Sequence, residues 1–149
     1  MTIYRNILAV VGVAEDSSQV ATRARDFAAG TPGARLTLLH VVEYVPVEPL
    51  SDSLLPSVQL ETELVERARV RLNGLALSMG PEVRWEVASG NVKTEITRFA
   101  REGGFDLIVI GSHERHGLSI LVNLTEDTVL HAAPCDVLAV RLPLGARTT

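Results

Sequence analysis

The sequence is poor in cysteine, lysine and aromatic residues. Among its 149 residues it holds one cysteine, Cys135, one lysine, Lys93, and six aromatic side chains. A single cysteine cannot form a disulfide within the chain, which is typical of proteins from a reducing compartment. The arginines are scattered and the net charge is −4, so no basic stripe is available to neutralise the phosphates of a nucleic acid. We therefore expect no nucleic-acid partner.

Long apolar runs are also missing. No stretch approaches the roughly 20 apolar residues that a membrane-spanning helix needs. The first ten residues, MTIYRNILAV, lead into a strand-like run without the basic region and small-residue cleavage site of a secretory signal. We expect no membrane partner and a cytoplasmic location. Hydrophobic residues still make up 46% of the chain, and its length predicts one domain, 1–149, with a substantial core.

Strand-like and helix-like segments alternate along the chain. Strands are expected at residues 5–13, 34–44, 82–90, 105–111 and 133–142. Helices are expected from a cap at Asp16 or Ser17 to Gly30, from Val58 to Met79, from Asn91 to Gly103, and from Thr125 to Ala132. Apolar strands that alternate with amphipathic helices indicate a parallel sheet with right-handed crossovers over both faces. The fold class predicted is therefore α/β.

The segments between and within these elements give finer expectations. Residues 45–57 hold three prolines and are expected to form a long surface loop. Asn91 is the expected N-cap of its helix, and Gly103 is the expected stop. The first helix is expected to bury one stripe of side chains, made of Val20, Ala24, Phe27 and Ala28.

Four motifs occur in a recognisable order and spacing: ILAV followed by ED, LTLLHVVE, FDLIVIGSH-x-R-x-GLS, and APCDVLAV. Together they resemble a universal stress protein over essentially the whole chain. The resemblance implies a five-stranded parallel sheet in the order 3-2-1-4-5, with two helices on each face. It also implies a homodimer formed through the C-terminal strand, and a role in surviving stress through contacts with a protein partner that the sequence does not name.

Some members of that family bind ATP through a motif resembling G-x2-G-x9-G-[ST], and part of this motif is present. Gly111 and Thr125 fall on its first and last positions, and Val41 falls on a position that flanks adenine. Ser112 follows Gly111 and offers a further donor. An ATP- or AMP-binding stress sensor with a divergent site is therefore an alternative function.

The remaining positions of the motif depart from the family pattern. Gly12 stands where the nucleotide-binding members carry an aspartate, and Glu114 and Leu124 stand where the two inner glycines are expected. A glutamate neither allows close backbone approach to a phosphate nor carries the right charge. Glu126 and Asp127 add two more carboxylates at the helix entrance, where an anion would bind. We therefore expect no nucleotide cofactor, and a mobile loop at residues 112–123.

Other residues of potential chemical interest have simpler explanations. His113 and His116 form only half of a metal site, even with Cys135 downstream, because structural zinc usually has four ligands. Cys135 is expected to be a buried small hydrophobe and not a nucleophile. His40 is expected to be a hydrogen-bonded core histidine, and Trp85 a packing residue and not a platform for stacking a base.

An enzyme would need a positioned acid, base or nucleophile, and no set of residues provides one. Adenylating enzymes of similar fold carry a signature resembling SGGxDS, whose glycines are absent from VGVAEDS at residues 11–17. Electron-transfer flavoprotein subunits also share the fold class, but their chains are much longer. A small hydrolase or transferase is the third hypothesis, behind the two stress-protein functions, and we expect no enzymatic activity.

Overall fold

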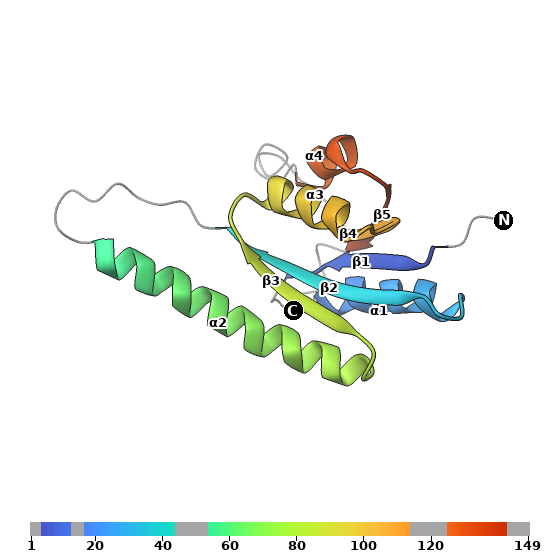
Figure 1. The fold of residues 1–149 in the computed structure, drawn as a ribbon, viewed down its shortest axis with the longest axis horizontal. Coiled ribbons are helices and arrows are strands. Elements are labelled where there is room, and N and C mark those ends of the chain that lie inside the picture. The colour runs from blue at the N-terminus through green and yellow to red at the C-terminus, as the bar shows by residue number, and fades with distance from the viewer. Residues whose placement is uncertain (1–3, 13–16, 44–53, 114–124, 143–149) are drawn as a thin grey trace.

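The computed structural model describes residues 4–12, 17–43, 54–113 and 125–142. Strands and helices alternate throughout these ranges (Figure 1). The strands are β1 (Asn6–Val10), β2 (Arg35–Val42), β3 (Arg84–Ser89), β4 (Leu107–His113) and β5 (Asp136–Leu142). The helices are α1 (Ser17–Ala29), α2 (Leu54–Met79), α3 (Val92–Glu102) and α4 (Thr125–Ala132).

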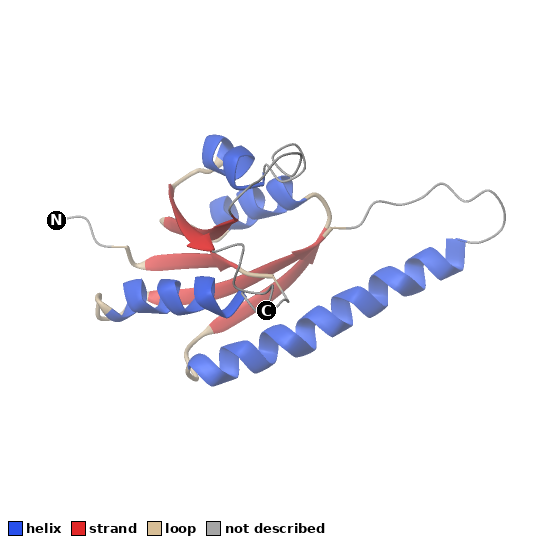
Figure 2. Cartoon of the chain, turned by 180° about the vertical axis from the view of Figure 1, so that it is seen from behind, coloured by secondary structure: helices blue, strands red, loops and turns tan. Residues whose placement is uncertain are grey.

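The five strands form one parallel sheet in the order β3-β2-β1-β4-β5. The expected fold class and strand order are confirmed. Helices α1 and α2 cover one face of the sheet, and α3 and α4 cover the other (Figures 1 and 2). Strands β3 and β5 are the two edge strands, and β1 lies in the centre, between β2 and β4.

Each face of the sheet has its own apolar cluster. Ile7 and Ala9 of β1 point to the α1/α2 side, whereas Leu8 of the same strand points to the α3/α4 side, and all three are fully buried. The α1/α2 cluster takes its helical side chains from Val20, Ala21, Ala24, Ala68, Leu72 and Ala76. The α3/α4 cluster takes them from Ile96, Ala100 and Val129. Small alanines on the helices let them lie close to the aliphatic strands.

Polar side chains join the strands at the amino-terminal edge of the sheet. The Asp106 carboxylate accepts hydrogen bonds from the backbone N–H groups of Arg5 and Asn6, at 2.9 and 3.1 Å. The Tyr4 hydroxyl donates to Asp136 over 2.7 Å and so joins the segment before β1 to the start of β5. Tyr4, Asp106 and Asp136 therefore have a structural role: their hydrogen bonds hold the beginnings of the strands together.

Helix α2 is longer than the sequence predicted. It begins at Leu54 and not at Val58, so its first turn includes Pro56 from the segment expected to be a loop. A proline is compatible with the first turn of a helix, because the N–H that it lacks has no partner there. None of the helices in the described part of the chain is long and apolar enough to cross a membrane.

Two other expectations need correction. Ser112 and His113 belong to β4, where they pair with Arg141 and Leu142 of β5, and are not part of a loop. The rest of the expected loop, residues 114–123, lies outside the described residues. Phe27 is 41% exposed, whereas Val20 and Ala24 of the same stripe are buried. The prediction that Phe27 is buried was wrong.

Helix α3 has both of the ends that the sequence predicted. The Asn91 side chain accepts a hydrogen bond from the Thr94 N–H over 2.9 Å, in the geometry of an N-cap. Gly103 is the C-cap, and its N–H donates to the Phe99 carbonyl at 2.9 Å. Gly104 then adopts a left-handed φ of 66°, which favours glycine and turns the chain toward β4.

The Asn91 cap provides a test of this local structure. Replacing Asn91 with alanine leaves the Thr94 N–H without its side-chain acceptor and is expected to lower the free energy of unfolding by about 1 kcal/mol. Urea denaturation measures this change. Asn73→Ala, at an exposed position inside α2, is the matched control and should not destabilise. Equal destabilisation by the two variants would show that capping is not the cause.

Candidate functional site

The candidate site lies at the carboxyl ends of β2, β1 and β4. Val10 of β1 pairs with Leu39 of β2 and with Ile110 of β4. Continuing the same register by two residues places Gly12 level with Val41 and Ser112, on strands about 4.8 Å apart. The chain leaves β1 in one direction to β2 and returns from β3 to β4 on the other side. This is the topological switch point at which open α/β sheets bind ligands.

Side-chain alternation places these three positions on the same face of the sheet. Leu8 and Val10 of β1, Val41 of β2 and Ile110 of β4 all contact the α3/α4 cluster. Gly12 and Ser112, two residues beyond Val10 and Ile110, therefore share that side. Helix α4 begins at Thr125 on the same side; the Thr125 side chain is outside the description. The structure thus brings four of the five predicted site positions to one corner of the sheet.

Gly111 faces the opposite side. A Cβ atom at Gly111 would lie 2.7 Å from Leu142 Cδ1 and 3.2 Å from Val20 Cγ2, which is too close for ordinary packing. Its backbone does not require glycine, since its φ is not positive. Contact with α1 and β5 therefore accounts for this glycine. Its match to the first position of the ATP motif has a structural explanation that does not involve a phosphate.

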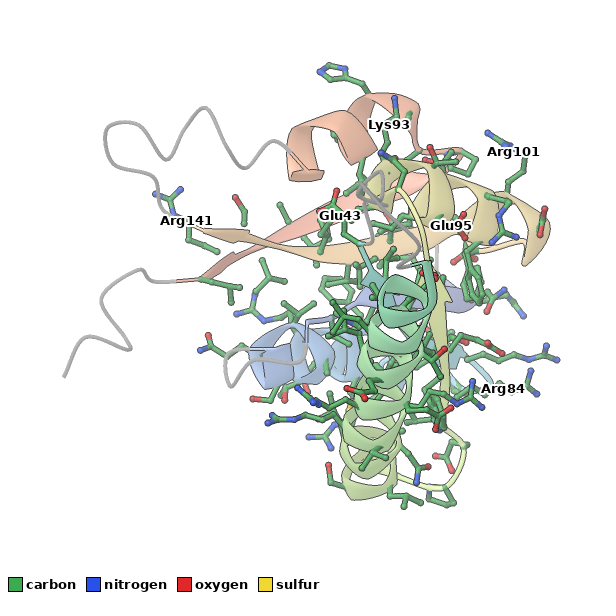
Figure 3. The ribbon with its side chains drawn as sticks, turned by 90° about the vertical axis from the view of Figure 1, so that its left-hand side faces the viewer. Glu43, Arg84, Lys93, Glu95, Arg101 and Arg141 are labelled. Atoms are coloured by element: carbon green, nitrogen blue, oxygen red, sulfur yellow. The ribbon has the colours of Figure 1, made fainter. Side chains whose placement is uncertain are left out.

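The described charges at the carboxyl ends of the strands show no excess of cations. Figure 3 looks onto this end of the molecule and labels Glu43 after β2, Lys93 and Glu95 in the first turn of α3, and Arg141 near the end of β5. Glu61, whose carboxylate accepts a hydrogen bond from Ser89 at the end of β3, adds a third carboxylate, so these charges give no net positive charge. Glu95 is already bound by Arg98. This part of the edge therefore lacks the cationic surplus that would favour a polyphosphate.

Three residues with potential chemistry have structural roles. His40 Nδ1 lies 2.9 Å from the Val11 carbonyl oxygen, so its side chain ties β2 to the end of β1. The predicted hydrogen bond is confirmed, although His40 is half-buried and not part of the core. Burial raises the pKa of the Cys135 thiol, and the carboxylates of Asp106 and Asp136 raise it further. A raised pKa leaves less of the reactive thiolate at neutral pH, which agrees with a packing role.

Trp85 also has a structural role, and the described residues form no metal site. The Trp85 ring packs against the α1/α2 cluster, and the guanidinium carbon of Arg69 lies 5.5 Å from the ring centroid. Within the described ranges, no three His, Cys, Asp or Glu side chains gather as metal ligands. The side chain of His113 and all of His116 lie outside the description.

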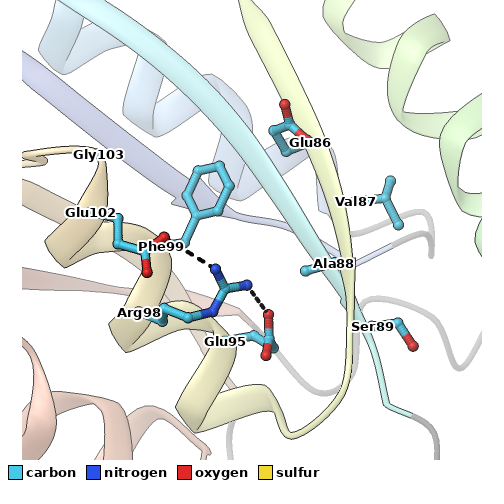
Figure 4. Close-up of a pocket in the computed structure, with 9 residues that line it drawn as sticks. All are labelled: Glu86, Val87, Ala88, Ser89, Glu95, Arg98, Phe99, Glu102 and Gly103. Atoms are coloured by element: carbon cyan, nitrogen blue, oxygen red, sulfur yellow. Dashed lines mark hydrogen bonds and ion pairs between the residues drawn. The ribbon is translucent and has the colours of Figure 1, made fainter.

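A pocket that the sequence did not indicate lies between β3 and α3 (Figure 4). It is an open pocket of about 480 Å³ between the β3 edge strand and the Phe99 ring. Arg98 binds Glu95, and its Nη1 lies 3.2 Å from Glu102 Oε1. Glu86 reaches the pocket from β3 and gives it an excess of carboxylates. In the sequence, the i,i+3 and i,i+4 spacing of these α3 charges is typical of a solvated helix face. The pocket becomes visible only in the structure, because β3 forms its other wall.

The model of the universal stress protein family matches residues 3–141. The chain belongs to the universal stress protein family. Two relatives from Coxiella burnetii support this membership. Universal stress protein A homolog 1 is 37% identical over 139 residues, which cover 92% of this chain and 96% of the relative. Universal stress protein A homolog 2 is 33% identical over 144 residues, which cover 95% of this chain and 98% of the relative.

Solved structures of other universal stress proteins share the fold. UspA from Lactobacillus plantarum is 26% identical, with a TM-score of 0.73 over 95% of this chain and 100% of that one. The Archaeoglobus fulgidus universal stress protein solved in complex with dAMP is 18% identical, with a TM-score of 0.57 over 93% of this chain and 98% of that one. The second likeness establishes the arrangement of the elements alone.

The contact at Gly111 can be tested by a double-mutant cycle. Gly111→Ala places a methyl group against Leu142 and is expected to lower the free energy of unfolding of this universal stress protein by about 1–3 kcal/mol. Leu142→Val removes the atom in closest conflict, so the double variant should lose less stability than the sum of the single variants. Chemical denaturation measures all three.

Gly74→Ala is the matched control for this cycle. A Cβ atom at Gly74 meets nothing within 4 Å, and alanine favours a helix over glycine by about 1 kcal/mol, so this variant should be more stable than the wild type. Strict additivity of Gly111→Ala and Leu142→Val would contradict the packing explanation.

Proposed function

We propose that this universal stress protein acts in the cytoplasm as a stress-response homodimer, through contacts with other proteins and without a bound nucleotide. The observation that carries the proposal is the make-up of the carboxyl edge. Gly12 provides no carboxylate at the end of β1, and the packing of Val20 and Leu142 accounts for Gly111. The match to the ATP motif is thereby reduced to Thr125 at the start of α4.

Electrostatics at the α4 entrance supports the same conclusion. Glu126 and Asp127 follow Thr125 in the first turn of α4, where a carboxylate is stabilised by about 0.3–1 kcal/mol. A triphosphate at this helix end would therefore bind at a helical turn whose sequence supplies two carboxylates. Two like unit charges about 4 Å apart repel by roughly 4 kcal/mol at an effective dielectric near 20. Free backbone N–H groups at the helix end offset only part of that repulsion.

A divergent nucleotide sensor, binding ATP or AMP, is the alternative function. It is favoured by the placement of Gly12, Val41, Ser112 and Thr125 on one side of the topological switch point. The dAMP complex of the Archaeoglobus fulgidus protein shows that a relative of the same fold accepts a nucleotide. Ser112 and Thr125 retain hydroxyl groups that could serve as donors to such a ligand.

We also propose that the protein has no enzymatic activity. Catalysis of acyl or phosphoryl transfer needs a nucleophile or base held within hydrogen-bonding reach of its partner. His40, the best candidate base by residue type, directs Nδ1 to the Val11 carbonyl oxygen. Cys135 has a raised thiol pKa. Neither residue is paired for catalysis in the described part of the protein.

The proposed homodimer uses the edge strand β5. This strand exposes Asp136, Ala139 and Arg141 and buries Val140 and Leu142, and its outer edge has no neighbouring strand among the described residues. An open apolar edge promotes aggregation unless something covers it. Pairing with the same strand of a second copy about a two-fold axis would cover both edges at once.

The nucleotide proposal makes a direct prediction. Calorimetry of the wild-type protein with ATP and Mg²⁺ should show no saturable binding at micromolar nucleotide, and acid extraction of the purified protein should release none. The reasons are the absent carboxylate at Gly12 and the carboxylates of α4. A clear micromolar affinity would instead establish the sensor function.

A set of variants provides the positive control for that experiment. Gly12→Asp, Glu114→Gly and Leu124→Gly, combined with Glu126→Gln and Asp127→Asn, should create measurable ATP affinity on the same scaffold. The two neutralising substitutions alone should have little effect, because without the glycines the backbone cannot approach the phosphates. Binding by the neutralised variant alone would show that charge, and not backbone access, prevents ATP binding.

The β5 proposal predicts a dimer in dilute solution. Light scattering should give twice the chain mass for the wild type. Ala139→Lys places like charges near the two-fold axis and is expected to yield a monomer, as lysines do on natural edge strands. Ala139→Ser, which stays small, is the matched control and should remain dimeric. A wild-type monomer would contradict the proposal.

A further inference from the structure

Strand β3 is an open edge of the sheet. It is the first strand in the order β3-β2-β1-β4-β5, and no described element pairs with its outer side (Figure 1). The N–H of Gly90, directly after β3, donates to the Val42 carbonyl oxygen of β2 over 3.0 Å. Backbone groups alternate in direction along a strand, so the N–H and C=O groups of Trp85, Val87 and Ser89 point outward. The sheet leaves these donors and acceptors available for another strand.

The two faces of this edge differ in chemistry. Trp85 and Val87 pack against the α1/α2 cluster, and the Arg69 guanidinium carbon lies 5.5 Å from the centroid of the Trp85 ring. Glu86 lies between them and points to the opposite face, where it lines the pocket against α3 (Figure 4). A strand added to β3 would meet apolar side chains and a cation on the first face, and a carboxylate on the second.

The pocket on the α3 face has more carboxylates than cations. It is lined by Glu86, Glu95 and Glu102 and by one cation, Arg98, which binds both α3 glutamates. Within the described ranges, the Glu86 carboxylate makes no hydrogen bond or ion pair. The Phe99 ring is an apolar wall of the same pocket. A lysine or arginine side chain can pack its stem on such a wall and bring its charge to the carboxylates.

The neighbouring cations give the edge a polarity. Lys93 and Arg101 are exposed on α3 and do not line the pocket. Arg84 shares the face of Glu86, two residues earlier on β3, and also lies outside the pocket. Opposite charges favour one another across neighbouring strands and like charges repel. The edge therefore suits a strand with an acidic residue opposite Arg84 and basic residues opposite Glu86 and Ala88.

We propose that β3 binds an extended segment of a partner protein as an added antiparallel strand, whose basic side chains enter the pocket and alternate with apolar ones. Main-chain hydrogen bonds supply the affinity of such a contact, and pockets for alternate side chains supply its specificity. The antiparallel ladder is the more stable of the two per residue. This inference rests on the proposed function through protein contacts, for which it names a surface and the chemistry of the partner.

The charges on β3 also decide which strands are refused. Charged side chains on an edge strand prevent indiscriminate pairing, and Arg84 and Glu86 have this effect on a wholly apolar strand. The same two charges select a strand of complementary pattern. Strand β3 lies at the opposite edge of the sheet from β5, so a dimer paired through β5 presents two of these edges to partners.

Binding of a labelled peptide to the full chain, followed by fluorescence anisotropy, tests the proposal. In the antiparallel register, the peptide acetyl-Thr-Lys-Val-Lys-Val-Glu-Thr-amide places its lysines opposite Ala88 and Glu86 and its glutamate opposite Arg84. The reversed sequence, Thr-Glu-Val-Lys-Val-Lys-Thr, has the same composition and charge but places a lysine opposite Arg84. The first peptide should bind at least about threefold more tightly. No saturable binding up to about 1 mM, or no preference for the first peptide, would overturn the proposal.

Variants of Glu86 test the pocket. Glu86→Gln should weaken binding of the first peptide about two- to fivefold, whereas Glu63→Gln, at an exposed position on α2, is the matched control and should not. Glu86→Lys should instead prefer Thr-Lys-Val-Glu-Val-Glu-Thr, whose central glutamate lies opposite the new lysine. Equal effects of Glu86→Gln and Glu63→Gln, or no change of preference in Glu86→Lys, would show unspecific attraction and contradict the proposal.

Methylation of the peptide backbone tests strand addition directly. In the proposed register the N–H groups of the two valines face β3, and those of the two lysines face away. N-methylation of both valines should abolish binding, whereas N-methylation of both lysines should be tolerated. Binding by the valine-methylated peptide would overturn strand addition.

Two further outcomes separate this proposal from its rivals. A second copy of the chain is the other possible occupant of the edge: a dimer that persists in Ala139→Lys and is lost when Glu86→Lys is added would identify it and overturn the proposal. Failure of the peptides to bind would leave the proposed function standing, because that function is tested by ATP calorimetry and light scattering. Micromolar ATP binding by a protein that also binds the first peptide would overturn the nucleotide-free function and leave the β3 surface established.

Discussion

The burial of β1 and β4 on both faces is the constraint on which the rest of the structure depends. Ile7, Leu8 and Ala9 are consecutive and fully buried, so two layers of helices must cover the sheet. Removal of this apolar surface from water is the main stabilising term. Because helices cover both faces, the central strands reach solvent only at their two ends. The amino-terminal ends are joined by Asp106 and Asn6, and the carboxyl ends form the candidate site.

The carboxyl edge illustrates how one residue can match a binding motif for a structural reason. Gly111 occupies the first position of an ATP motif, yet the closeness of Val20 and Leu142 requires a glycine there whether or not a ligand binds. The neighbouring residue Ser112 faces the other side of the sheet, toward α3 and α4. A scaffold of this kind can carry one glycine of a binding motif without the carboxylate and the inner glycines, because packing alone accounts for Gly111.

The outer surfaces of the molecule show where apolar residues exceed what the core needs. The α1/α2 cluster is complete with Ala68, Leu72 and Ala76 on the inner side of α2. Val70 and Leu77 on the outer side gain nothing from the fold of a single chain, and neither does the open edge of β5. The proposed function through protein contacts has a use for the open edge of β5, and strand pairing is the mode that this geometry favours.

The amino-acid sequence by itself determined the order of elements, the parallel sheet and the cap at Asn91, because hydrophobic period and capping chemistry act over a few neighbouring residues. It did not determine the start of α2, since the prolines of the preceding segment resemble a loop and a first helical turn equally well. It also led us to bury Phe27, because a helical stripe does not reveal how much of it the sheet can cover. Only the tertiary structure decided that Gly111 faces α1 and that Glu86 and Arg98 line the same pocket. Both facts depend on which residues from distant parts of the chain become neighbours when the strands are laid side by side.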